Sequence, residues 1–168
     1  MESVYIETSV VSYLVARPPA RTLAQQWHVW TKDWWRLRRP YFECVISAEV
    51  LREAAAGDPK ASRQQLGVLS TLTVLRRPQT VDELAEAFLS VGALPSKAKA
   101  DAAHLAVATS HRVDYLLTWI MKHLANALIL RRLRPVAQQH GHSLPVVWNP
   151  LQLMGEIEYE DRLNFAGT

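Results

Sequence analysis

Short apolar runs alternate with longer stretches of helical pattern, and this alternation constrains the fold more than any other feature of the chain. The strand-like runs lie at residues 3–7, 41–46, 72–75, 114–119 and 144–148. Parallel strands need long crossover connections, and helices in those connections cover both faces of the sheet. The sequence therefore predicts an α/β domain of three layers, α/β/α, with a mostly parallel central sheet.

Local signals indicate where some of the helices begin and end. Ser47 follows the second strand-like run and is a good N-cap for the next helix. Gly57 would end that helix, and Asp58 followed by Pro59 would start another. A further helix is expected over residues 97–111.

Composition and charge are those of one globular domain. Of 168 residues, 49% are hydrophobic and 21% are charged, and the net charge of +3 is compatible with an anionic partner. Cys44 is the single cysteine, which excludes an internal disulfide and suits a reducing compartment. No apolar run approaches the roughly 20 residues that span a membrane, and Glu2 stands where a signal peptide needs positive charge. We expect a cytoplasmic protein with one domain over 1–155 and an acidic C-terminal tail over 156–168.

Three carboxylates stand where a parallel sheet would bring them together. Glu7 ends the first apolar run, Glu53 lies in the helix after the second, and Asp101 lies near the start of helix 97–111. Ligands collect in the crevice beyond the carboxyl ends of such strands. Acids that meet there repel one another unless a divalent cation holds them, and oxygen ligands suit Mg²⁺ or Mn²⁺. The pattern predicts a metal site of the kind that many nucleases use.

Each of these residues also has a simpler structural interpretation. Glu7 and Asp101 could complement the positive ends of helices. Glu53 could be a surface residue paired with a nearby arginine. His104, three residues after Asp101, could orient that acid or be a buried imidazole with satisfied hydrogen bonds. The spacing alone leaves both interpretations open.

Four segments together carry a resemblance to a known family. They are Tyr5–Leu14, Ser47–Glu53 closed by Gly57-Asp58-Pro59, Asp101–Ala106, and Asp114–Trp119 with Lys122–Ala127. In this order the chain resembles PIN-domain proteins over residues 3 to about 155. It is most similar to the VapC-type toxins of toxin–antitoxin pairs, in a branch whose first acid is Glu. The resemblance implies that the three-layer α/β/α domain is PIN-like.

The resemblance also implies an activity and a set of residues that perform it. The activity is that of a metal-dependent endoribonuclease, the toxin of a toxin–antitoxin pair, which hydrolyses RNA phosphodiesters through a water activated by Mg²⁺ or Mn²⁺. Glu7, Glu53 and Asp101 would be the catalytic and metal-binding residues. A small antitoxin protein would block the cleft, and the toxin would be a homodimer. Four polar residues are expected to assist: Ser9, Thr118, His123 and Asn126. The last two lie three residues apart on the helix expected after Trp119 and could face the same cleft.

One position departs from the family pattern. The family usually places Asn or Asp after the strand that ends Thr118-Trp119, and here Ile120 follows. Mg²⁺ commonly retains several waters, so the loss of one outer ligand need not abolish its binding. The alternative function is a catalytically impaired PIN-like module that binds RNA or a protein without cutting.

Two other classes of protein fit the sequence poorly. A receiver-like phosphorylation domain needs a central phosphoacceptor Asp and a lysine at a late strand end, and residues 118–120 supply neither. A dinucleotide-binding domain or a small-molecule hydrolase is not supported, because the chain has no glycine-rich loop.

Aromatic and basic residues gather in ways that permit RNA binding without requiring it. Trp27, Trp30 and Trp34 recur at helical spacing, which favours a packed face, although such rings can also stack on single-stranded RNA. Basic residues cluster at 32–39, 76–77 and 131–134. They form solvated faces or, if they surround the acids, would position phosphates.

Overall fold

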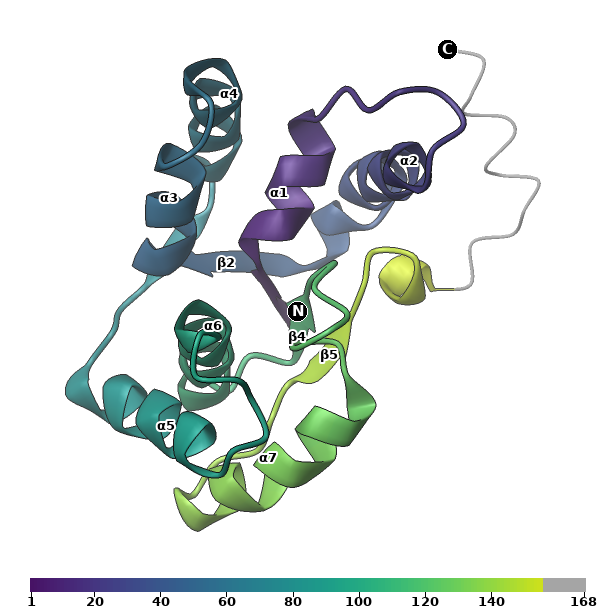
Figure 1. Ribbon diagram of the computed structural model, residues 1–168. Coiled ribbons are helices and arrows are strands. Elements are labelled where there is room, and N and C mark those ends of the chain that lie inside the picture. Colours follow the sequence, from purple (N-terminus) through teal and green to yellow (C-terminus); the bar gives the residue numbers. More distant parts are fainter. Residues whose placement is uncertain (156–168) are drawn as a thin grey trace.

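A parallel five-stranded sheet lies at the centre of the computed structural model, which describes residues 1–155 (Figure 1). The sheet has the order β3-β2-β1-β4-β5, and every neighbouring pair is parallel. Its strands are β1 (Ser3–Ile6), β2 (Glu43–Ser47), β3 (Thr73–Leu75), β4 (Tyr115–Leu117) and β5 (Val146–Trp148). The predicted parallel sheet is confirmed. The acidic tail predicted over 156–168 lies outside the described residues.

Helices cover both faces of the sheet. One face carries α1 (Thr8–Val15), α2 (Leu23–Leu37), α3 (Ala48–Ala55) and α4 (Pro59–Leu69). The other carries α5 (Gln79–Ser90), α6 (Lys99–Ser110) and α7 (Ala127–Gln139). Figure 1 shows the two groups above and below the sheet, which confirms the three-layer α/β/α architecture. No helix within residues 1–155 is long and apolar enough to cross a membrane.

The helix starts predicted at Ser47 and Asp58 are found, with one difference at Ser47, and the helix expected over 97–111 spans Lys99–Ser110. Asp58 caps α4 by accepting hydrogen bonds from two backbone N–H groups, and Pro59 is the first residue of that helix. Ser47 occupies the N-cap position of α3, but its side chain makes no capping hydrogen bond. Its hydroxyl instead bonds the buried Tyr5, as described below. Helix α3 ends at Ala55, shortly before Gly57.

The central strands and α6 contribute much of the hydrophobic core, which the other helices complete. Val4, Tyr5 and Ile6 of β1 have no exposed surface, because β1 is flanked by strands on both sides and by helices on both faces. In α6 every residue from Ala102 to Thr109 is buried. A helix that is buried all round must be apolar or fully hydrogen-bonded. This places a strong constraint on His104, which lies in its middle.

The three tryptophans at helical spacing pack as predicted. Trp34 is fully buried, and its indole N–H donates to the Leu153 carbonyl at 3.2 Å. Trp27 is half-buried and stacks on Trp119, with ring centroids 4.9 Å apart and planes inclined by 8°. Trp30 also stacks on Trp119. The packed face of α2 is therefore confirmed, and it supports the segment that follows β4.

Candidate metal centre

The carboxyl ends of β1 and β4 form the point where the strand order reverses. The chain passes from β1 to β2 and β3 on one side, and then crosses to β4 and β5 on the other. In open α/β sheets, ligands bind outside the strand ends at such a switch point. Glu7 directly follows β1, and Thr118 directly follows β4. The register aligns Ile6 with Leu117. Glu7 and Thr118 are therefore neighbours at the carboxyl ends of these two strands.

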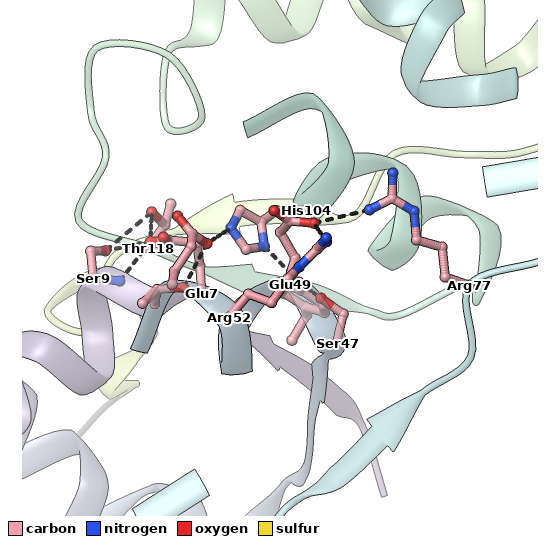
Figure 2. A network of polar contacts seen from close by, with 11 residues as sticks. Glu7, Ser9, Ser47, Glu49, Arg52, Arg77, His104 and Thr118 are labelled. Atoms are coloured by element: carbon pink, nitrogen blue, oxygen red, sulfur yellow. Dashed lines mark hydrogen bonds and ion pairs between the residues drawn. The ribbon is translucent and has the colours of Figure 1, made fainter. Parts of the chain in front are cut away.

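Glu7 ends β1 and caps α1 at the same time. Its N–H donates to the Leu117 carbonyl at 3.1 Å and so continues the ladder between the strands. Its carboxylate oxygen Oε2 accepts from the Ser9 N–H at 3.1 Å and from the Thr118 hydroxyl at 2.7 Å. The Ser9 hydroxyl donates to the same oxygen (Figure 2). The predicted helix-end role of Glu7 and its predicted place at the sheet edge are thus both present in one residue.

The charge of Glu7 is only partly compensated by the protein. Glu7 is 3% exposed, and this burial raises its pKa above the ordinary value, against the opposing effects of His104 and of the hydroxyl donors. All its hydrogen bonds go to Oε2. Oε1 has no hydrogen-bond partner among the described residues. It is therefore the oxygen of Glu7 that is left to bind a cation.

A series of hydrogen bonds between side chains connects Glu53 with the interior of the sheet. Glu53 Oε1 accepts from the Thr8 hydroxyl at 2.9 Å and also pairs with Nε2 of His104. Nδ1 of His104 lies 2.7 Å from the Tyr5 hydroxyl, which in turn lies 2.7 Å from the Ser47 hydroxyl. His104, Tyr5 and Ser47 are all buried. Each of these groups has a partner, which explains how they are tolerated in the core.

Glu53 and His104 stabilise each other as an ion pair. Burial alone would lower the pKa of His104, but the hydrogen bond with Glu53 and the nearby carboxylates hold that pKa above its ordinary value. Burial likewise would raise the pKa of Glu53, but its hydrogen bond and charge interaction with His104 hold it below its ordinary value. Glu53 therefore has a cationic partner within the protein, whereas the partners of Glu7 that hydrogen-bond to it are neutral.

Glu7, Glu53 and His104 form one group, in which the two acids are the potential ligands and the imidazole contacts Tyr5 and Glu53. One carboxylate oxygen of each acid and one ring nitrogen of His104 lie within 4.8 Å of one another. Two of the three are acids that the sequence predicts for this site. His104 is the residue that sequence reasoning did not assign to the group. The signal was its position in an apolar, alanine-rich helix, where an imidazole needs a buried polar partner.

The residues of this group fit a hard divalent cation. Glu7 Oε1 and Glu53 Oε2 have no hydrogen-bond partner among the described residues, so two carboxylate oxygens are available. Carboxylate oxygen is the ligand that Mg²⁺ and Mn²⁺ prefer, and Mg²⁺ keeps several waters, so few protein ligands suffice. Ser9 and Thr118 orient Glu7 in the way that outer partners orient metal ligands.

Asp101 lies beside this group and not within it. It is in the first turn of α6, one turn before His104, where a carboxylate complements the positive end of the helix. Its Oδ2 lies 2.9 Å from Nδ1 of His123, and both side chains are 19% exposed. The role of Asp101 as a metal ligand stays a prediction.

His123 and Asn126 differ from their expected arrangement. They were expected three residues apart on a helix facing the cleft, but the segment before α7 is a turn and that helix begins at Ala127. Asn126 is the N-cap of α7, and its side-chain oxygen accepts from two backbone N–H groups at 3.0 and 3.3 Å. The expected helix is therefore wrong at these positions, because Asn126 starts the helix instead of lying inside it.

Ile120 is part of the support for Thr118. Its side chain is half-buried and packs against the hydrophobic core. Its N–H donates to the Thr118 hydroxyl oxygen at 2.9 Å, and that hydroxyl donates to Glu7. The main chain at this position thus orients an outer partner of Glu7, whereas the side chain offers a metal no ligand atom.

Comparison with known proteins shows the fold. No family model and no curated protein sequence matches the chain. The structure of FitAcB from Neisseria gonorrhoeae is similar, with 15% sequence identity and a TM-score of 0.54 over 89% of this chain and 99% of that chain. A structure of FitAB bound to an IR36 DNA fragment has the same identity, 15%, and the same TM-score, 0.54, over 92% of this chain and 99% of that one. The predicted three-layer α/β/α fold with a mostly parallel sheet is confirmed, and these two structures share it.

Proposed function

We propose that this protein is a Mg²⁺- or Mn²⁺-dependent endoribonuclease and the toxin of a toxin–antitoxin pair. The observation that carries the proposal is the grouping of Glu7, Glu53 and His104 at the switch point of a PIN-like fold. Two carboxylate oxygens there lack partners among the described residues, and one of them belongs to an acid that burial leaves poorly compensated. A divalent cation would satisfy both.

The residues around the cation have separate tasks. Glu7 and Glu53 bind it through their available oxygens, and Asp101 adds negative charge directly or through water. Ser9 and Thr118 hold Glu7 in place. When bound, the cation activates a water and stabilises charge on the phosphate. His104 positions Glu53 and keeps it ionised.

We also propose a protein partner and an RNA substrate. The chain resembles VapC-type toxins in sequence, and the similar FitAB structure is bound to a DNA fragment. The resemblance supports a toxin that acts as a homodimer and whose cleft is blocked by a small antitoxin. The basic excess of the chain is consistent with RNA as the substrate.

A second candidate function is RNA or protein binding without cleavage. Ile120 favours it, because this residue stands where the family usually has Asn or Asp. Its half-buried side chain contributes packing and no ligand atom. The grouping of two acids with available oxygens favours the nuclease.

A cleavage assay with a matched set of variants tests the proposal. Labelled single-stranded RNA is incubated with the protein in Mn²⁺, in Mg²⁺ and in EDTA, using Glu7→Gln, Asp101→Asn and the control Glu83→Gln, which changes an exposed acid of α5. We expect metal-dependent cleavage by the parent and by the control, and none by the two site variants. Cleavage in EDTA, or unchanged cleavage by Glu7→Gln, would contradict the metal mechanism. RNA binding without cleavage at any Mn²⁺ concentration would favour the second candidate.

A further inference from the structure

A polar groove adjoins the candidate metal centre on its α3 and α6 side. It is lined by Glu49, Arg52, Arg77, Asp82, Lys99, Ala100 and Ala103. Ala103 directly precedes His104 in α6, and Arg52 directly precedes Glu53 in α3. Figure 2 shows Arg77 reaching the Glu49 carboxylate from the side away from His104. We call this feature the basic groove.

The basic groove has an excess of positive charge. Three of its side chains are cationic and two are anionic, which leaves one net positive charge. Among the described residues, Lys99 makes no ion pair, so its ammonium group is available. The groove also includes the first turn of α6, which has no capping side chain. Its backbone N–H groups add to the positive potential.

Ion pairs hold the guanidinium groups of the groove in position and leave some of their N–H donors unused. Arg77 Nη1 donates to Glu49 Oε2 at 3.0 Å, and its Nη2 and Nε lie 2.6 and 2.7 Å from Asp82 Oδ1. Arg52 donates to the same Glu49 oxygen through Nη2. A guanidinium carries more N–H donors than these contacts use. The groove is thus ordered before any anion binds, which lowers the entropy lost on binding.

We propose that the basic groove binds a backbone phosphate of the RNA next to the one that is cleaved. This rests on the proposed nuclease function. A strand whose scissile phosphate lies at Glu7 and Glu53 has a neighbouring phosphate on either side. The groove offers cationic donors on the α3 and α6 side, where Arg52 directly precedes Glu53 and Ala103 directly precedes His104. Arg and Lys contacts to phosphate fix the register of a strand without reading its sequence.

Salt-dependent binding in the absence of metal tests the groove directly. Fluorescence anisotropy of a labelled single-stranded RNA in EDTA compares the parent with Lys99→Gln and with Lys97→Gln. Lys97 is exposed, lies two residues upstream and does not line the groove, so it is a matched control. We expect Lys99→Gln to weaken binding and to reduce the slope of log affinity against log salt by about 0.7, the value for one phosphate of a single strand. Lys97→Gln should change neither.

A second variant has the opposite expected sign. Asp82→Asn removes a negative charge from an exposed side chain and releases two donors of Arg77. It should tighten RNA binding and steepen the salt dependence. If Lys99→Gln and Lys97→Gln weaken binding equally, or if Asp82→Asn weakens it, the groove has no specific role and the proposal is overturned.

Failure of the groove and failure of the nuclease function give different results. If the parent does not cleave RNA but Lys99→Gln still reduces the salt slope, the groove binds RNA backbone and the nuclease function is wrong. If the parent cleaves RNA and Lys99→Gln binds it as the parent does, the groove proposal is overturned. It is also overturned if the parent binds no RNA in EDTA. Loss of a partner protein by Lys99→Gln, with RNA binding unchanged, would instead make the groove a site for a partner's carboxylate.

Discussion

The Glu7 side and the Glu53 side of the candidate metal centre compensate a carboxylate in opposite ways. Glu7 is 3% exposed and is hydrogen-bonded by the neutral donors of Ser9 and Thr118. Glu53 has a side chain that is 36% exposed and is paired with the imidazole of His104. Burial raises the pKa of Glu7, while His104 outweighs burial and lowers that of Glu53. Glu53 has its cation within the protein, whereas Glu7 relies on a more distant charge.

This difference indicates where a bound metal would act. A cation near the available oxygens adds the opposite charge that Glu7 lacks, and it adds less to Glu53, which is already paired. The hydroxyls on the Glu7 side orient its carboxylate without neutralising its charge. The same two acids should therefore respond alike to mutation in an activity assay and differently in a stability assay.

The largest expected effect is the loss of RNA cleavage when either Glu7 or Glu53 is substituted. Glu7→Gln and Glu53→Gln each remove a proposed ligand while keeping the side-chain size. Changes to outer partners of metal ligands already cost about 10–100-fold, so each of these substitutions should cost more than about 100-fold in cleavage rate at fixed Mn²⁺. Single-turnover cleavage of labelled RNA measures this loss. A variant that cleaves within a factor of a few of the parent would remove that acid from the metal site.

Thr118→Val tests the neutral support on the Glu7 side. The change keeps the shape and removes the hydroxyl that donates to Glu7 at 2.7 Å and accepts from the Ile120 N–H at 2.9 Å. As the loss of an outer partner, it should weaken Mn²⁺ affinity or cleavage by about 10–100-fold. Calorimetric titration with Mn²⁺ separates the two effects. Unchanged affinity together with unchanged cleavage would show that Ser9 alone is enough to orient Glu7.

Much of this candidate centre can be predicted from the sequence, and the part that cannot be predicted depends on how the strands pair. Apolar runs predict the strands, and an acid at the end of such a run must lie at the sheet edge, so Glu7 could be placed in advance. The contact between Glu7 and Thr118 depends on the register of β1 and β4, where Ile6 faces Leu117. Short apolar strands do not specify that register by themselves.

Two further residues show why side-chain roles are harder to predict than elements. The partner of His104 was open in the sequence, because Asp101 lies on the same face of the helix, whereas Glu53 is reached only when α3 packs against α6. Asn126 was expected in the cleft. It caps α7 instead, because an asparagine that precedes a helix satisfies backbone N–H groups that would otherwise be unpaired.

Without metal, substitutions of Glu7 and of Glu53 should shift the melting temperature in opposite directions. The raised pKa of Glu7 means that its contribution to stability is complete below its ordinary pKa and is lost as the pH rises through the raised value. At about pH 8, Glu7→Gln should therefore raise the melting temperature in EDTA. Glu53→Gln should lower it, because it leaves the buried His104 without its anionic partner, at a cost of about 1–3 kcal/mol. Thermal melts of both variants and the parent give the comparison, and shifts of equal sign would contradict it.

The pH profile of the parent without metal gives a related test. The pKa of His104 is also raised, so its contribution is present below its ordinary pKa and is lost as the pH rises through the raised value. The pKa of Glu53 is lowered, so the contribution of Glu53 to the stability of the folded protein is lost only as the pH falls through that lowered value. Stability in EDTA should therefore decline toward alkaline pH, and Mn²⁺ should reduce the decline. A profile that rises toward alkaline pH in EDTA would overturn these assignments.

The smallest expected effect concerns Ile120, on the Glu7 side. Its N–H supports Thr118, and this contact does not depend on the side chain. Ile120→Asn adds an oxygen, and Ile120→Asp adds a charge, at the position where the family usually carries one of the two. Both should lower the Mn²⁺ concentration needed for cleavage, Asp more than Asn, by less than the roughly 10–100-fold of an established outer partner. Because the side chain is half-buried against the core, both should also melt at a somewhat lower temperature than the parent. Titrating cleavage against Mn²⁺ for the parent, the two variants and the apolar control Ile120→Val measures the gain. Four identical curves would show that Ile120 serves packing alone, and that the Glu7 side binds its cation without a ligand from this position.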